Sequence, residues 1–220
     1  MTDQNLPIVI TVDGPSGSGK GTLSHMLANH LGYNLLDSGA LYRLVALASM
    51  KREIQLADES AVTAVALQLN VEFRLSGSTM LDGVEVTNAI RQEIVSMGAS
   101  QIAAHPSVRA ALLERQRAFA AHPGLVADGR DMGTIVFPNA QTKFFLTASA
   151  EARADRRFKQ LQKRGEIVDK DALIADILER DERDSKRAIS PLVPAEDATI
   201  IDSTNMSIQE VFETMLSLAK

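Results

Sequence analysis

The sequence IVITV at residues 8–12, followed by GPSGSGKGT at residues 14–22, decides the fold. The β-branched run at residues 8–12 is bounded by turn residues, a pattern that predicts a buried strand. Beyond the glycines, apolar residues recur with helical spacing from Leu23 to Leu31, and Gly32 ends the segment. The expected order is therefore strand, glycine-rich loop and helix, which is the arrangement of a phosphate-binding loop.

Each residue type in this loop has a physical task. The glycines let the backbone wrap closely around a phosphate, successive N–H groups point inward, and the helix N-terminus adds its positive end. Lys20 supplies a full charge to the terminal phosphates. The strict motif has Ser or Thr directly after the lysine, whereas Gly21 stands there and the hydroxyl follows at Thr22. The loop therefore does not identify a residue that contacts a metal ion. A glycine-rich turn without a ligand is the alternative, and the flanking strand and helix favour nucleotide binding.

Four further short apolar segments predict strands, at residues 35–37, 125–128, 143–146 and 199–202. Helical patterns separate these strands, with Ser38 as an expected helix cap and a capping box expected at Ser207 and Glu210. Five strands alternating with helices predict an α/β fold, a parallel sheet with helices on both faces.

A different pattern interrupts this alternation between residues 71 and 86. Apolar residues recur with period two, and the dipeptide Asp82-Gly83 between such runs predicts a β-hairpin. We expect this small antiparallel sheet to be an insertion, with strand positions that include Leu75. Helical spacing resumes at Ile90, Ile94 and Met97.

The composition is that of a globular protein. The 220 residues are 45% apolar and 23% charged, without cysteine. A disulfide scaffold, a thiol nucleophile and a cysteine zinc site are therefore excluded. No apolar stretch approaches the length of a membrane span, and residues 1–7 lack the features of a signal peptide. We expect a cytoplasmic protein without a membrane partner.

The basic residues are concentrated in one region. The net charge is −5, but residues 151–187 contain 11 basic and 10 acidic residues, so this region is +1 and the remainder −6. Within it, residues 153–164 hold six basic residues against one acidic residue. Such a patch suits a few phosphates and is too short for a nucleic-acid duplex. The alternative is a solvated, charge-laced helix.

Candidate site residues follow two strands and line two helices. Asp37-Ser38-Gly39 and Asp128-Gly129-Arg130-Asp131 each end a predicted strand, where the carboxyl edge of a parallel sheet faces its ligand. One helix aligns Arg180, Arg183, Asp184 and Arg187 on one face, and the preceding helix aligns Arg153, Arg156, Arg157 and Gln160. Turn salt bridges and solvated helices are the alternatives.

The whole chain resembles the bacterial-type cytidylate kinases, a P-loop nucleoside monophosphate kinase family that transfers a phosphoryl group from ATP to CMP or dCMP. The resemblance rests on six motifs that are specific when taken together: GPSGSGKGT at Gly14, LLDSGALYR at Leu35, ASQIAAHPSVR ending at Arg109, RQRAF at Arg115, ADGRDMGT at Ala127 and RDERDSKRAISPL at Arg180. Gly21 is also similar to the loop of nucleoside monophosphate kinases.

The resemblance implies a single P-loop NTPase-like domain over residues 1–220, with a five-stranded parallel core. It adds a monophosphate-binding insertion at about residues 38–104, which includes the small antiparallel sheet, and a basic lid at about residues 151–166. ATP would be the donor, bound by Gly14, Pro15, Ser16, Gly17, Ser18, Gly19, Lys20, Gly21 and Thr22. Mg²⁺ would be held mainly by phosphates and water, without a protein metal site. We further expect the protein to be a monomer.

The family's functional residues carry over to matching positions. The acceptor would lie against Ser38, Tyr42, Arg43, Ser100, Arg109, Arg130, Asp131, Arg180, Asp184 and Arg187. Catalysis would depend on Lys20, Arg130, Arg156, Arg157 and Arg180, because phosphoryl transfer relies on positioning and on positive charge around the moving group.

Two other readings compete with this one. Another kinase of the same loop class could act on UMP, AMP or a sugar acid. A GTP-dependent switch is the alternative from another class, but the sequence lacks the Asn-Lys-x-Asp and Asp-x-x-Gly motifs that such switches normally carry.

Overall fold

A computed structural model describes residues 6–73, 78–163, 165 and 167–219. The chain divides into two compact units, one formed by residues 1–36 and 119–220 and the other by residues 37–118. The predicted strand position Leu75 lies outside the described residues.

The first unit is built on a five-stranded sheet with the strand order β2-β6-β1-β7-β8. Its strands are β1 (Ile8–Asp13), β2 (Asn34–Asp37), β6 (Gly124–Gly129), β7 (Thr142–Thr147) and β8 (Thr199–Asp202). The pairings of β1 with β6 and β7, and of β7 with β8, are parallel. The predicted five-stranded parallel sheet is confirmed, with every strand within two residues of its expected bounds.

One core cluster of this unit lies on one face of the sheet. Alternate residues of β1, Ile10 and Val12, pack there against Leu23 and Leu27 of α1 (Lys20–Leu31) and against Val211 of α8 (Ile208–Leu218). Side chains alternate across a strand, so Thr11 and Asp13 point to the opposite face. There β1 contacts η2, a π-helical turn (Met132–Val136).

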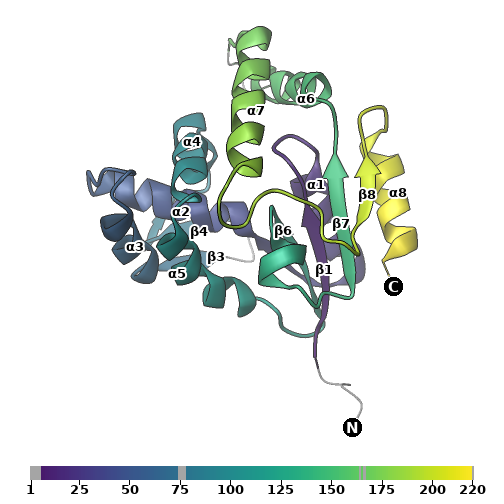
Figure 1. Cartoon of the computed structure of the whole chain (residues 1–220), viewed down its shortest axis with the longest axis horizontal. Coiled ribbons are helices and arrows are strands. Elements are labelled where there is room, and N and C mark those ends of the chain that lie inside the picture. The colour runs from purple at the N-terminus through teal and green to yellow at the C-terminus, as the bar shows by residue number, and fades with distance from the viewer. Residues whose placement is uncertain (1–5, 74–77, 164, 166, 220) are drawn as a thin grey trace. The chain divides into compact units, whose positions relative to one another are not determined.

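Two charged helices, α6 (Ala150–Gln162) and α7 (Lys170–Ser185), pack against each other beyond the carboxyl ends of the strands. Figure 1 shows the arrowheads of β1 and β7 pointing toward them. Ser149 caps α6 and Asp169 caps α7, each accepting a hydrogen bond from a backbone N–H of its own first turn. The predicted capping box at Ser207 and Glu210 opens α8.

The second unit combines helices with a small antiparallel sheet, β3-β4-β5. Its elements are α2 (Ser38–Lys51), α3 (Glu59–Leu67), β3 (Val71–Phe73), β4 (Thr79–Leu81), β5 (Val84–Glu85), the 3₁₀ turn η1 (Ala89–Arg91), α4 (Glu93–Ile102) and α5 (Pro106–Arg117). The predicted hairpin at Asp82-Gly83 is confirmed: both residues have positive φ, 50° and 79°, as a two-residue turn between β4 and β5 requires.

One local prediction in this unit is wrong. Ser38 does not cap α2: Asp37 is the cap, and its carboxylate accepts a hydrogen bond from the N–H of Ala40. The helical pattern expected at Ile94 and Met97 is confirmed by α4, although both side chains are exposed; the buried face of α4 includes Val95, Ala99 and Ile102. Small residues on α4 let it lie close to α2: a Cβ on Gly98 would be 2.7 Å from Met50 Cε.

No helix within the described ranges is long and apolar enough to cross a membrane.

Candidate active site

The phosphate-binding loop joins β1 to α1, as predicted. Gly17 and Gly19 adopt left-handed backbone conformations, with φ of 79° and 94°, which glycine reaches without strain. Lys20 is buried, and its Nζ lies 3.2 Å from the carbonyl oxygen of Pro15. Gly19, the N-cap of α1, has no side chain for capping, and the first turn of α1 contains no acidic residue. The start of α1 is therefore suited to bind an anion through its backbone N–H groups.

Glycine at position 21 has a local reason. A Cβ there would lie 3.2 Å from Oδ2 of Asp128, so the carboxylate at the end of β6 approaches the first turn of α1. A Ser or Thr side chain at this position would displace it.

Two arginines of α6 donate hydrogen bonds to backbone carbonyl oxygens of the loop. Arg153 donates from NH1 to the carbonyl oxygen of Ser16 over 3.1 Å, and it forms a two-pronged ion pair with Asp181 of α7. Arg156 donates from NH1 to the carbonyl oxygen of Ser18 over 3.3 Å, and also to the backbone and side chain of Ser203. Because these contacts use the loop's carbonyl oxygens, they do not compete for the loop's N–H groups.

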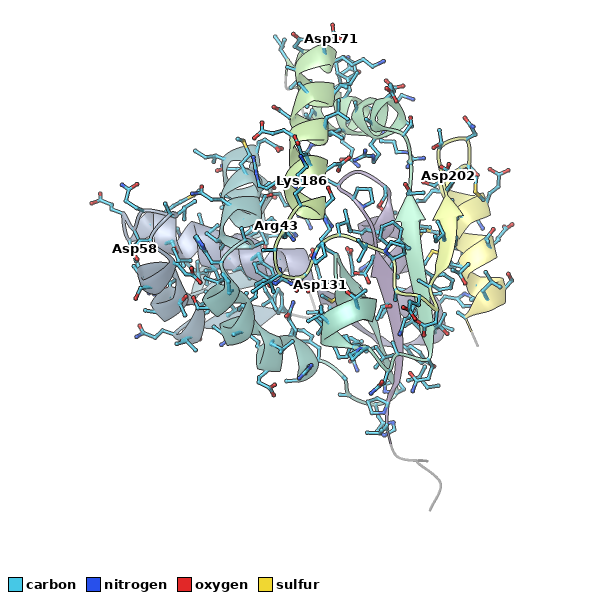
Figure 2. The ribbon with its side chains drawn as sticks, viewed as in Figure 1. Arg43, Asp58, Asp131, Asp171, Lys186 and Asp202 are labelled. Atoms are coloured by element: carbon cyan, nitrogen blue, oxygen red, sulfur yellow. The ribbon has the colours of Figure 1, made fainter. Side chains whose placement is uncertain are left out.

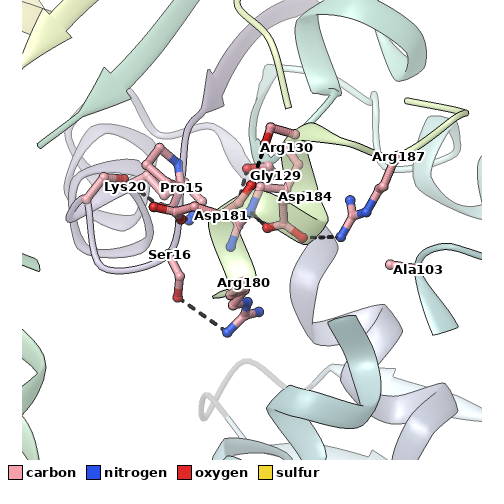
Figure 3. A network of polar contacts seen from close by, with 12 residues as sticks. Pro15, Ser16, Lys20, Ala103, Gly129, Arg130, Arg180, Asp181, Asp184 and Arg187 are labelled. Carbon is pink, nitrogen blue, oxygen red and sulfur yellow. Dashed lines mark hydrogen bonds and ion pairs between the residues drawn. The ribbon is translucent and has the colours of Figure 1, made fainter. Parts of the chain in front are cut away.

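Asp184 of α7 organises a second group of arginines. Its carboxylate accepts from Nε of Arg130 over 3.0 Å and also pairs with Arg187 (Figure 3). Burial works to raise the pKa of Asp184, but the charges of Arg130, Arg187 and Arg180 outweigh this and hold the pKa below its ordinary value. Arg180 reaches the loop, with NH1 3.4 Å from Oγ of Ser16.

Asp13, the last residue of β1, joins the loop to the segment after β6. Its two carboxylate oxygens accept hydrogen bonds from the backbone N–H groups of Met132 and Gly133, each over 2.8 Å. Burial raises the pKa of Asp13 to about 7, and the charges of Asp131 and Asp128 act in the same direction, against the two hydrogen bonds. Asp131, which is labelled in Figure 2, directly precedes η2. Its side chain makes no capping hydrogen bond to this turn.

The second unit holds the other predicted acceptor residues. Ser38 of α2 accepts a 2.7 Å hydrogen bond from Nε2 of Gln116, and the guanidinium of Arg109 lies 5.7 Å from the centre of the Tyr42 ring. Arg43 pairs with Asp37 over 2.8 Å, while its buried Nε has no hydrogen-bond partner among the described residues. Ser100 of α4 is buried.

The predicted site residues divide into two groups, one in each unit. The first contains the loop residues 14–22 with Arg130, Asp131, Arg156, Arg157, Arg180, Asp184 and Arg187, and the second contains Ser38, Tyr42, Arg43, Ser100 and Arg109.

Four further residues of the first unit have roles that the sequence analysis did not assign: Asp13, Arg153, Asp181 and Ser203. A signal existed for Arg153, which precedes Arg156 by three residues on the same helix face, and for Asp13, which ends a buried strand directly before the loop. Neither signal specified the backbone partner.

Comparison with known proteins identifies relatives over nearly the full chain. A sequence model of the cytidylate kinase family matches residues 10–220. A cytidylate kinase of Pseudomonas aeruginosa (strain LESB58) is 56% identical over 213 residues, covering 94% of this chain and 93% of the relative. A cytidylate kinase of Shewanella denitrificans is 53% identical over 217 residues, covering 96% of each chain. Among solved structures, a gluconokinase from Sinorhizobium meliloti 1021 has a TM-score of 0.47 and 18% identity, covering 96% of this chain and 91% of that chain.

Proposed function

The chain belongs to the cytidylate kinase family, and on that premise we propose that it transfers the γ-phosphoryl group of ATP to CMP or dCMP through the two groups of residues described above. The observation that carries the proposal is the loop at residues 14–22, a glycine-rich turn with a buried lysine at the N-terminus of α1. The products are ADP and CDP or dCDP.

ATP binds with its phosphates on the loop. The backbone N–H groups of the loop and of the first turn of α1 donate to phosphate oxygens. The ammonium group of Lys20 neutralises negative charge on the terminal phosphates. The contact between Lys20 and the Pro15 carbonyl keeps the ammonium group at the loop before the nucleotide arrives. Because no covalent intermediate is needed, the chain's task is to hold donor and acceptor in line.

Arginines neutralise the charge that spreads over the transferred group. Arg130 and Arg180 come from different elements of the first unit, and Asp184 holds Arg130 and Arg187 through ion pairs. Fixed positive charge that is oriented before the reaction stabilises a phosphoryl-transfer transition state without the cost of reorganisation. We assign Arg156 to the support of the loop, because its guanidinium donates to Ser18 and Ser203, and we assign Arg157 to the moving phosphoryl group.

Cytosine differs from uracil in carrying an N4 amino donor beside an N3 acceptor, whereas uracil reverses both. A site with a donor and an acceptor in fixed positions separates the two bases, because the wrong base leaves buried polar groups unpaired. Arg109 supplies a donor, and the Ser100 hydroxyl and Asp131 supply acceptors. The Nε of Arg43 is buried and has no hydrogen-bond partner among the described residues. We propose that it donates to an oxygen of the acceptor's phosphate.

Mg²⁺ accompanies ATP in this proposal and is held mainly by phosphate oxygens and water. The residues fit this arrangement, since Gly21 leaves no hydroxyl directly after the lysine and Asp128 occupies the space beside it. When bound, the ion neutralises charge on the β- and γ-phosphates. We further propose that the enzyme acts in the cytoplasm as a monomer, with small molecules as its only substrates and with neither nucleic acid nor membrane as a partner.

A panel of acceptors tests the proposal. The purified chain is incubated with ATP, Mg²⁺ and one of CMP, dCMP, UMP, AMP or gluconate, and ADP release is measured. We expect CMP and dCMP to be turned over with kcat/KM at least about tenfold above that of every other acceptor, the discrimination that one unpaired buried group provides. Equal use of UMP, or preference for AMP or gluconate, would reject the acceptor assignment.

A further inference from the structure

Asp13 lies between the phosphate-binding loop and the segment that joins β6 to η2. It ends β1, so the next residue, Gly14, already belongs to the loop, and Gly14 lies tightly against β7: a Cβ there would be 2.1 Å from the carbonyl oxygen of Leu146. The backbone at Asp13 is therefore fixed, and its side chain leaves the strand from a rigid position.

The side chain of Asp13 caps the first turn of η2, which is distant in the sequence. The first N–H groups of a helical turn have no partner within that turn. In η2 these groups belong to Met132 and Gly133, and both carboxylate oxygens of Asp13 accept from them, 119 and 120 residues away in sequence. The adjacent Asp131, at the N-cap position of η2, makes no capping hydrogen bond.

Close packing makes this contact specific. A Cβ on Gly133 would lie 2.9 Å from Oγ1 of Thr11, 3.2 Å from Cδ of Lys143 and 3.4 Å from Oδ2 of Asp13. Only glycine at this position lets the start of η2 approach β1 closely enough for both bonds. The residues directly before η2 are Arg130, which the proposed function assigns to the transferred phosphoryl group, and Asp131, which it assigns to the base of the acceptor.

We propose that Asp13 is a positioning residue for phosphoryl transfer: its ionised carboxylate fixes the segment that carries Arg130 and Asp131 relative to the phosphate-binding loop. This inference rests on the proposed function, because it assigns a consequence to the acceptor residues named there. We assign Asp13 no contact with either substrate, because its carboxylate oxygens bind the N–H groups of Met132 and Gly133. It acts by hydrogen bonding the start of η2 to the end of β1, in addition to the packing of η2 against β1 and the strand pairing of β1 with β6.

The ionisation of Asp13 gives the proposal a distinctive readout. The pKa of Asp13 is about 7, so the carboxylate is ionised at pH 8 and largely protonated at pH 6. A protonated carboxyl carries an O–H donor and no negative charge, so it accepts hydrogen bonds from the two N–H groups more weakly than the carboxylate does. The charged groups around it are Asp128 in β6, Asp131 directly before η2, and Lys143 of β7, whose Nζ is bound to Asp197 and to the Pro138 carbonyl.

The test compares wild type with Asp13→Asn in the reaction with ATP and CMP. The amide keeps the size of the side chain but presents an N–H₂ group to one of the two backbone donors. We expect KM for CMP to rise about tenfold or more and kcat to fall, the effect of losing one charge-assisted hydrogen bond. The dissociation constant of a non-hydrolysable ATP analogue should stay within about threefold of wild type, because Arg153 and Arg156 still support the loop.

The pH profile separates positioning from a general structural role. The ratio of kcat/KM for CMP between wild type and Asp13→Asn should be largest at pH 8 and fall toward unity at pH 6. Ionisation of the substrates affects both proteins equally and cancels in this ratio. A ratio that is constant with pH, an unchanged KM for CMP, or an equal loss of affinity for the ATP analogue would each overturn the proposal.

Two further variants complete the test. Gly133→Ala pushes η2 away from Asp13 without changing any charge, and it should also raise KM for CMP and spare the ATP analogue; it decides the question if Asp13→Asn does not fold. Asp58→Asn is the matched control, because Asp58 caps α3 by accepting from the N–H of Ala61 over 3.0 Å in the other unit. If wild type does not phosphorylate CMP, the proposed function fails; if it does and the variants match it, only this inference fails.

Discussion

Replacing Asp184 with asparagine tests the arginine cluster through its electrostatics. The carboxylate is buried, with a side-chain exposure of 2%, and it pairs with Arg130 and Arg187, whose side chains are 18% and 5% exposed. The substitution keeps the size and one acceptor oxygen but leaves two arginines near each other without a counter-charge.

Removing one member of a buried ion pair costs about 3–5 kcal/mol. The partial exposure of Arg130 and the remaining carbonyl oxygen reduce this, and we expect Asp184→Asn to lower the free energy of unfolding by about 2–3 kcal/mol. For a chain of this length that corresponds to a fall in Tm of ~5–10 °C. Because Arg130 loses its anchor, kcat should fall together with a rise in KM for CMP, whereas KM for ATP should change little.

The assay is thermal unfolding by circular dichroism at pH 6 and pH 8, with steady-state kinetics on the same samples. The Asp184 pKa lies below its ordinary value, so the carboxylate is ionised at both pH values; its stabilising contribution is lost only as pH falls through that lowered pKa. The Tm difference from wild type should therefore be equal at pH 6 and pH 8. A Tm within about 1 °C of wild type would refute the view that Asp184 holds the arginines.

Three further substitutions test other parts of the site. Lys20→Ala should leave the circular dichroism spectrum unchanged and lower kcat by about a hundredfold or more, and turnover within about threefold of wild type would remove the lysine from catalysis. Arg109→Met and Asp131→Ala should each erode the preference for CMP over UMP, measured as the ratio of kcat/KM values; unchanged ratios would move base recognition elsewhere. Gly14→Ala should fail to give folded protein, because its Cβ would meet the Leu146 carbonyl oxygen at 2.1 Å; a soluble variant with wild-type Tm would contradict this packing.

The sheet and the loop could be predicted because their signals are local. A β-branched run that leads into GPSGSGKGT indicates strand, loop and helix from a single stretch, and Asp82-Gly83 specifies its turn through the backbone conformations that these residues tolerate. The residue types at the ends of β1 and β6 likewise indicated where a phosphate ligand would bind.

The interactions that hold the site could not be predicted, since they join residues far apart in sequence to backbone atoms. Asp13 accepts from the N–H groups of Met132 and Gly133, and Arg153 donates to the Ser16 carbonyl. Any residue presents such backbone groups, so no side-chain pattern identifies the partner. The exposed Ile94 and Met97 have a related cause: apolar spacing predicts a helix, but tertiary packing decides which face is buried.

The transfer of label from ATP to the acceptor tests the central claim most directly. ATP labelled at the γ-phosphate is incubated with CMP and the purified chain, with Lys20→Ala as the control, and the nucleotides are separated. The account predicts label in CDP, in amounts equal to the ADP formed, and almost none with Lys20→Ala. Label released as inorganic phosphate, or ADP formation that is independent of CMP, would contradict it.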